Sequence, residues 1–307
     1  MIIYEEKSSI DDEPRAKNGQ WTKGSGSGSS VLKTKAVKVS KLKVARSRAS
    51  LPEHIKALKL PPAWTDIRYD DDPDAGLQAV GKDAKGRLQY VYSKKFVSQQ
   101  AAEKFERINA LDDKMREIDQ QVAAALKKKS EEAACLRLIM MTGIRPGSDK
   151  DTRAAKKAFG ATTLRGQHVV VKNGRVSLRF VGKKGVDLDI PVADPRLARE
   201  LIRRKAAAGK NGKLFATSSG KLSQFTHSLD GGGFKTKDMR TYLGTTLAQD
   251  LIEKKPVPRT EKEYRAAVRD VARIVSEQLG NTPTVALQSY IAPVSFAGWR
   301  QALDSRS

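Results

Sequence analysis

The chain has 307 residues, with 58 Lys or Arg against 35 Asp or Glu, so its formal net charge is +23. A surplus this large predicts a polyanionic partner, and nucleic acid is the first candidate. A single cysteine, Cys135, excludes an internal disulfide and a multi-thiolate metal site, and is typical of a reducing cytoplasm. The acidic start of the chain and the lack of a long apolar run give no indication of secretion or of a membrane partner.

Residues 1–50 have the composition of a flexible basic tail. Segment 24–30, GSGSGSS, has the composition of a flexible linker. Seven Lys or Arg residues follow between Lys33 and Arg48, with no Asp or Glu among them. We expect an arm that lies on phosphates, with a merely solvated tail as the alternative.

Residues 51–97 indicate a small β-rich domain. Segment 77–96 suggests short strands with a turn at Lys85-Gly86. Tyr90 and Tyr92 alternate with Val91, so both rings should project from one face of a strand.

The sequence pattern of residues 98–307 predicts a mainly α-helical catalytic domain with a small antiparallel sheet. The whole chain is therefore expected to be an α+β protein. Apolar residues recur every three or four positions as far as about 125, and a second helix should end near Gly143. Asn173-Gly174 between two apolar runs is a strong hairpin signal, and segment 186–192 is a candidate third strand. Four later helices are predicted. The first begins at an Asp194 cap and ends near 208, and the second covers about 236–251. The third begins at a Thr260/Glu263 capping box and ends near 279, and the fourth begins at Thr282-Pro283.

Several familiar catalytic sites are excluded by their residue patterns. The three histidines are far apart and lack metal-ligand spacing, and neither a Walker A loop nor GxGxxG is present. We therefore expect no metal and no cofactor.

A set of cations and one tyrosine remains as the candidate chemistry. Arg145 lies between two glycines beyond a helix end, and Lys183-Lys184 ends a hairpin strand. Lys237 and Arg240 share one helix face because they are three residues apart. Asn281 and Tyr290 follow near the end of the chain.

These residues, in this order, resemble the type IB topoisomerases of poxviruses and their bacterial and phage relatives. The segments LPPAWTD, GKDAKGRLQY, FGATTLRGQHV, KTKDMRTYLGT and GNTPTVALQSYI resemble segments of that family in the same order. The resemblance runs from about residue 58 to about 294. It implies an N-terminal β domain and a mainly α catalytic domain that close around duplex DNA.

The resemblance also implies the catalytic roles. Tyr290 would be the nucleophile, Arg145 and Arg240 would hold the scissile phosphate, and Lys183 would be the general acid. Asn281 stands where poxvirus enzymes have histidine, and Lys237 matches a position of less certain role.

Elementary chemistry agrees with these roles. Attack on a phosphodiester builds negative charge that fixed guanidiniums stabilise, and a cationic pocket helps a phenol of pKa near 10 to lose its proton. A phosphotyrosine keeps the bond energy for religation, so no ATP is needed. Asn281 can donate a hydrogen bond but cannot exchange a proton as histidine could.

The chain departs from the family pattern at a few positions. Ser148 stands where the family commonly has asparagine, and Leu287-Gln288 replaces Lys-Arg before the nucleophile. These differences bear on rate or DNA preference. Since Lys184 adjoins Lys183 on a predicted strand, the two should point to opposite faces, and only one can be the acid.

For binding of double-stranded DNA we look to the β domain, with Lys237 added from the catalytic domain. The candidates in the β domain are Lys82, Arg87, Gln89, Tyr90 and Tyr92, and a polar strand edge with packed tyrosines is the alternative for each.

Two other functions fit parts of the pattern. A tyrosine recombinase or integrase uses the same chemistry but assembles four protomers. It usually has His-x-x-Arg where this chain has Lys237-x-x-Arg240, which favours a topoisomerase. We expect a monomer that acts in the cytoplasm, on a bacterial nucleoid or on phage or viral DNA. A non-catalytic basic DNA-binding protein would explain the charge but would not need Tyr290.

Overall fold

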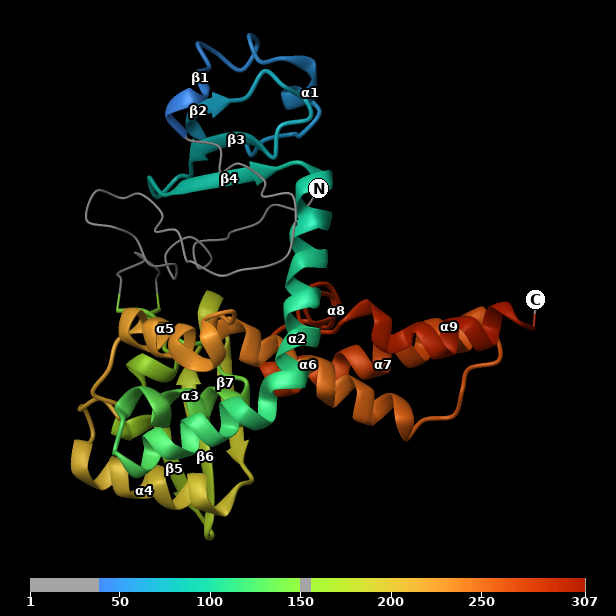
Figure 1. Ribbon diagram of the computed structural model, residues 1–307. Helices are drawn as coiled ribbons and strands as arrows, with labels where there is room; N and C mark the ends of the chain where they lie inside the picture. Colours follow the sequence, from blue (N-terminus) through green and yellow to red (C-terminus); the bar gives the residue numbers. More distant parts are fainter. Residues whose placement is uncertain (1–38, 150–155, 307) are drawn as a thin grey trace. The chain divides into compact units, whose positions relative to one another are not determined.

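The computed structural model describes residues 39–149 and 156–306. Helices and two small antiparallel sheets make it the predicted α+β protein (Figure 1). The chain divides into two compact units, the first ending at Glu103 and the second beginning at Lys104. In the described ranges no helix is long and apolar enough to cross a membrane.

The first unit contains a sheet of four antiparallel strands in the order β1-β2-β3-β4. The strands are β1 (Lys43–Val44), β2 (Thr65–Tyr69), β3 (Leu77–Lys82) and β4 (Leu88–Tyr92), with the short helices η1 (Val39–Lys41) and α1 (Glu53–Lys56). The predicted turn at Lys85-Gly86 joins β3 to β4, with Gly86 at a φ of 71°. The predicted β-rich character of 51–97 is confirmed.

The prediction that residues 1–50 are an unfolded tail is wrong for residues 39–50. Strand β1 pairs with β2, and Leu42 is only 6% exposed. Arg48, one of the cations assigned to a phosphate-binding arm, donates to the backbone carbonyls of Leu60, Pro61 and Pro62. The high Lys and Arg content of this stretch concealed an edge strand of only two residues, which is too short for an alternating pattern to show. Residues 1–38 of the predicted tail lie outside the described residues.

The second unit contains two hydrophobic clusters. In the first, the sheet β5-β6-β7 packs with the helices around it (Figure 1). Its strands are β5 (Val169–Lys172), β6 (Arg175–Val181) and β7 (Asp187–Val192), and its helices include α2 (Lys94–Lys127), α3 (Glu131–Thr142), α4 (Pro195–Ala208) and α5 (Ser219–Ser228). The Asn173-Gly174 hairpin is confirmed, and both residues have the positive φ that such a turn requires. Cys135 is buried in this core, where burial raises the pKa of its thiol.

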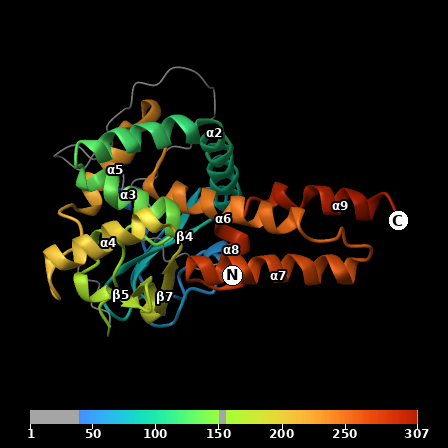
Figure 2. The same cartoon turned by 90° about the horizontal axis from the view of Figure 1, so that it is seen from below.

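The second cluster joins the C-terminal helices. They are α6 (Thr236–Glu253), α7 (Glu261–Leu279), α8 (Pro283–Ser289), η6 (Pro293–Phe296) and α9 (Ala297–Asp304). Figure 2 shows α6 and α7 side by side, with α8 at the end of α7. Helices α5 and α9 were not predicted, since each is short and begins without a strong apolar period.

Side-chain caps begin several of these helices as the sequence indicated. Asp194 accepts from the backbone N–H of Leu197, and Thr282 accepts from that of Val285. The Thr260 hydroxyl caps α7 by accepting from the backbone N–H of Glu263. The Glu263 carboxylate accepts from the N–H of Arg259 and not from that of Thr260, so the expected reciprocal capping box is only half formed.

Candidate active site

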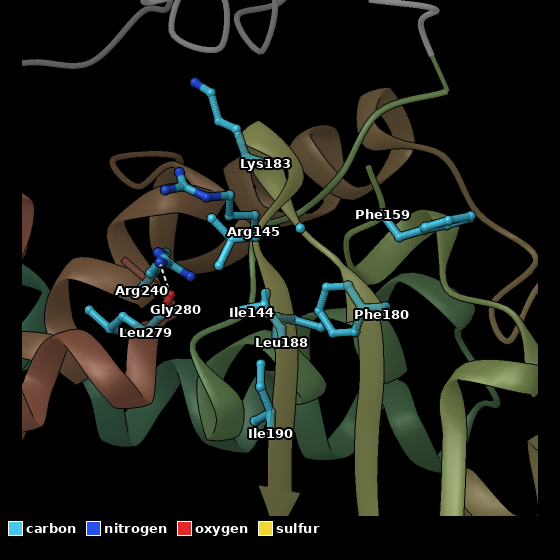
Figure 3. A pocket seen from close by; sticks show the side chains of 12 residues that line it. Ile144, Arg145, Phe159, Phe180, Lys183, Leu188, Ile190, Arg240, Leu279 and Gly280 are labelled. Carbon is cyan, nitrogen blue, oxygen red and sulfur yellow. Dashed lines mark hydrogen bonds between the residues drawn. The ribbon is translucent and has the colours of Figure 1, made fainter. Parts of the chain in front are cut away.

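Three of the five predicted catalytic residues line one small pocket of the second unit. Arg145, Lys183 and Arg240 surround it together with apolar side chains from the sheet and from the end of α7 (Figure 3). Arg145 follows the C-terminus of α3, Lys183 follows β6, and Arg240 lies on α6. The site therefore lies where the ends of several elements meet.

Arg240 is almost fully buried, at 3% exposed. Its two terminal nitrogens donate to the backbone carbonyls of Gly143, which ends α3, and Leu279, which ends α7. Both carbonyls belong to helix C-termini, where the partial charge is negative. Two helices from different clusters therefore hold the guanidinium in one orientation.

The positive charge of Arg240 has no carboxylate partner among the described residues. Burial, with a smaller contribution from the nearby Arg145, lowers the pKa of Arg240 to about 10, although Tyr290 acts in the opposite direction. Its Nε is buried without a hydrogen-bond acceptor in the described part of the chain. Because a buried, uncompensated cation is costly, this group is suited to an anion that arrives with the substrate.

Tyr290 lies directly beside both arginines. Nη1 of Arg145 donates to the Tyr290 hydroxyl at 3.2 Å, and the Arg240 guanidinium lies 4.7 Å from the centre of the Tyr290 ring. Burial by itself would raise the pKa of this phenol, but the positive charges of Arg240 and Arg145 outweigh it and hold the pKa below its usual value. The two arginines thus make it easier for Tyr290 to lose its proton during attack.

The backbone of Tyr290 is also tightly fixed. Its carbonyl accepts from the Thr245 hydroxyl at 3.2 Å. A Cβ at Gly244 would lie 2.7 Å from the same carbonyl oxygen, so only glycine permits α6 to approach this closely. The N–H of Tyr290 donates to Ala286, which makes Tyr290 the residue that ends α8.

Lys183 lies in a 3-10 turn, Lys183–Gly185, between β6 and β7, and its side chain is exposed. Figure 3 shows it pointing away from the pocket floor. The expectation that strand alternation separates Lys183 from Lys184 is wrong, because β6 ends at Val181 before either residue. The choice of Lys183 as the acid stays a prediction.

Asn281 follows the left-handed Gly280 that ends α7. Both polar atoms of its carboxamide are buried and have no hydrogen-bond partner among the residues described. Buried amides are nearly always paired. The unpaired amide therefore supports the expectation that Asn281 donates to a bound group.

Two further polar residues near the site were missed from the sequence. Asp238 is fully buried and accepts from the Lys235 backbone N–H and from Arg107. Lys104, on α2, donates to the carbonyl of Ser289, next to Tyr290. Lys104 resembled any other charge between the apolar positions of a long helix, and no local pattern could have distinguished it.

The five DNA-binding candidates of the first unit divide into two groups. Tyr90 and Tyr92 stack, with ring centres 6.4 Å apart, as their shared strand face predicts. Arg87 and Gln89 both donate to Oδ2 of Asp83, and Lys82 pairs with Asp66 at 2.6 Å. Only 5% of Gln89 is exposed, so its amide is engaged in the strand connection. Their role on DNA stays a prediction, as does that of Lys237.

Two known protein families match this chain. Residues 93–295 match the family described as eukaryotic DNA topoisomerase I, catalytic core. Residues 45–83 match the bacterial DNA topoisomerase IB N-terminal domain. The first match alone covers about two thirds of the chain, so the protein belongs to the type IB DNA topoisomerase family.

Individual relatives have low sequence identity to this chain but align with most of its length. The chain is 26% identical to DNA topoisomerase 1B of Acanthamoeba polyphaga mimivirus, over 78% of this chain and 77% of the relative. It is 25% identical to DNA topoisomerase 1B of vaccinia virus, over 78% and 79%. A solved structure of the XerH site-specific recombinase on a palindromic difH substrate aligns with a TM-score of 0.36 and 12% identity, over 73% of this chain and 59% of that one.

Proposed function

We propose that this protein relaxes supercoiled duplex DNA by cutting and resealing one strand, with Tyr290 as the nucleophile. Its membership of the type IB family supports the reaction class. The observation that carries the assignment of the site is the contact of the Tyr290 hydroxyl with Arg145 while Arg240 lies over its ring.

Cleavage begins when the Tyr290 oxygen attacks the scissile phosphorus. The phenol proton passes to solvent, a 3′-phosphotyrosyl bond forms, and the bond from phosphorus to the 5′-oxygen breaks. Arg145 and Arg240 stabilise the negative charge that develops on the non-bridging oxygens. Asn281 donates its amide to one of them, since its Nδ2 is otherwise unpaired among the described groups.

The leaving 5′-oxygen takes a proton from Lys183. An alkoxide is a poor leaving group, so this proton transfer lowers the barrier to cleavage. The exposed position of Lys183 at the pocket rim is compatible with access to a DNA strand. Reversal of the same steps reseals the strand, and the swivel between them releases supercoils.

The reaction stores the energy of the broken bond in the phosphotyrosine, so it needs no ATP. Arg145 and Arg240 supply the positive charge at the phosphate that a metal would otherwise provide. We propose that the protein acts as a monomer on double-stranded DNA in the cytoplasm, in a bacterial nucleoid or on phage or viral DNA. The relatives named topoisomerase support this assignment over the recombinase alternative.

The test is plasmid relaxation in EDTA without nucleotide, together with trapping of the covalent adduct. Tyr290→Phe should bind DNA but give neither relaxation nor adduct, because it lacks the nucleophilic oxygen. Tyr242→Phe is the matched control: its hydroxyl donates to Asp112 at 2.9 Å, and burial raises its pKa. Adduct formation by Tyr290→Phe, or an absolute requirement for Mg²⁺, would overturn the proposal.

A further inference from the structure

Lys104 on α2 makes an unusual hydrogen bond beside the nucleophile. Its Nζ donates to the backbone carbonyl of Ser289 at 3.0 Å, across 185 positions of sequence. The same ammonium lies 4.1 Å from the centre of the Phe105 ring. A lysine that is half-buried and bound to a backbone carbonyl is different from the solvated lysines that otherwise line a long helix.

Lys104 is not held in place by an ordinary ion pair. Burial, then the like charge of Lys237, lowers the pKa of Lys104 to about 8, and Arg107 adds to this effect. Tyr290 and Asp238 act in the opposite direction. Asp238 is already engaged with Arg107 at 3.3 Å, and no ion pair of Lys104 with it is found in the described part of the chain. An ammonium held here at an electrostatic cost needs another reason.

The carbonyl that Lys104 holds is adjacent in sequence to the nucleophile. Helix α8 has only seven residues, and its end is defined by Tyr290. Lys104 fixes the carbonyl before the Tyr290 Cα, and the Thr245 hydroxyl fixes the carbonyl after it. With both neighbouring peptide groups held, the direction in which the Tyr290 side chain leaves the backbone is determined.

We propose that Lys104 is a positioning residue that holds the Ser289 carbonyl and thereby aims the Tyr290 phenol at the scissile phosphate. This inference rests on the proposed function, because it assumes that Tyr290 is the nucleophile. Lys104 acts through the backbone and touches no reacting atom. A displacement of a nucleophile by 1 Å can cost about 100-fold in rate, so such a support has a measurable effect on cleavage.

The charge of Lys104 gives the proposal a pH signature. A charged donor makes a stronger hydrogen bond than a neutral one. For a lysine whose pKa is lowered to about 8, the protonated fraction falls by roughly tenfold between pH 7 and pH 9. The advantage of Lys104 should therefore be nearly complete at pH 7 and decline as the pH rises through 8.

The experiment measures single-turnover cleavage of a duplex that releases its short 5′-leaving strand, from pH 6.5 to 9.5. The variants are Lys104→Met, which removes charge and donor, and Lys104→Arg, which keeps both. Lys127→Met, at an exposed position of the same helix, is the matched control. The DNA dissociation constant and the Tm of every variant are measured in parallel.

We expect Lys104→Met to cleave at least tenfold more slowly at pH 7, with an unchanged dissociation constant, while Lys104→Arg recovers most of the rate. The ratio of wild-type to Lys104→Met rate should fall at least threefold by pH 9. A wild-type rate for Lys104→Met, or a rate ratio independent of pH, would overturn the positioning role. Failure of the wild-type protein to form any Tyr290 adduct would overturn the proposed function, and this inference with it.

Discussion

Gly244 offers a sharp test of how closely the fold must hold the nucleophile. The Cβ of an alanine there would lie 2.7 Å from the Tyr290 carbonyl oxygen, 3.0 Å from Leu279 Cδ1 and 3.2 Å from Tyr290 Cβ. Ordinary contact begins at 3.4 Å, so α6 and the Tyr290 backbone must separate by roughly 0.7 Å. The nearest of these atoms is the backbone oxygen of Tyr290, which cannot rotate aside as a side chain can.

Two effects on stability oppose each other in Gly244→Ala. Overpacking costs about 1–3 kcal/mol, and replacing glycine by alanine inside a helix returns about 1 kcal/mol. The free energy of unfolding should therefore fall by only about 0–2 kcal/mol. The cleavage rate should fall by about 10- to 100-fold, because the displaced group is the nucleophile.

The assay compares single-turnover cleavage with denaturant unfolding for the same variant. Gly298→Ala is the matched control, since a Cβ at Gly298 would meet nothing within 4 Å. It should leave the cleavage rate unchanged and raise the free energy of unfolding by up to about 1 kcal/mol, because Gly298 lies in α9. Cleavage by Gly244→Ala at the wild-type rate would refute the reasoning, since the contact would then carry no constraint on Tyr290.

Two further predictions concern the proton transfers. Lys183→Ala should cleave normal DNA slowly and recover most of its rate on a substrate with a 5′-bridging sulfur, because a thiolate leaves without protonation; Arg240→Ala should show no such rescue, and its rescue would contradict the division of roles. Arg145→Gln should shift the rise of cleavage rate to higher pH, since Arg145 is one of the two cations that lower the pKa of Tyr290. A pH profile of Arg145→Gln with an unmoved midpoint would show that its charge does not act on the phenol.

Much of the second unit follows from local sequence. The Asn173-Gly174 turn, the caps at Asp194 and Thr282, and the glycines that end α3 and α7 each have a local physical cause that is visible in a few residues. Short elements with weak signals were missed, among them β1 and α5. Their pairing and packing partners are distant in sequence, and no window of the sequence contains them.

The sequence by itself determined which residue types could carry the chemistry, because the order of Arg145, Lys183, Arg240 and Tyr290 matches a known family pattern. Tertiary structure decided how they are held. Arg240 is fixed by two carbonyls that end separate helices, and the Tyr290 backbone is fixed by Lys104 and Thr245 from two others. These contacts join residues 39 to 185 positions apart, so only the packing of the helices could bring them together.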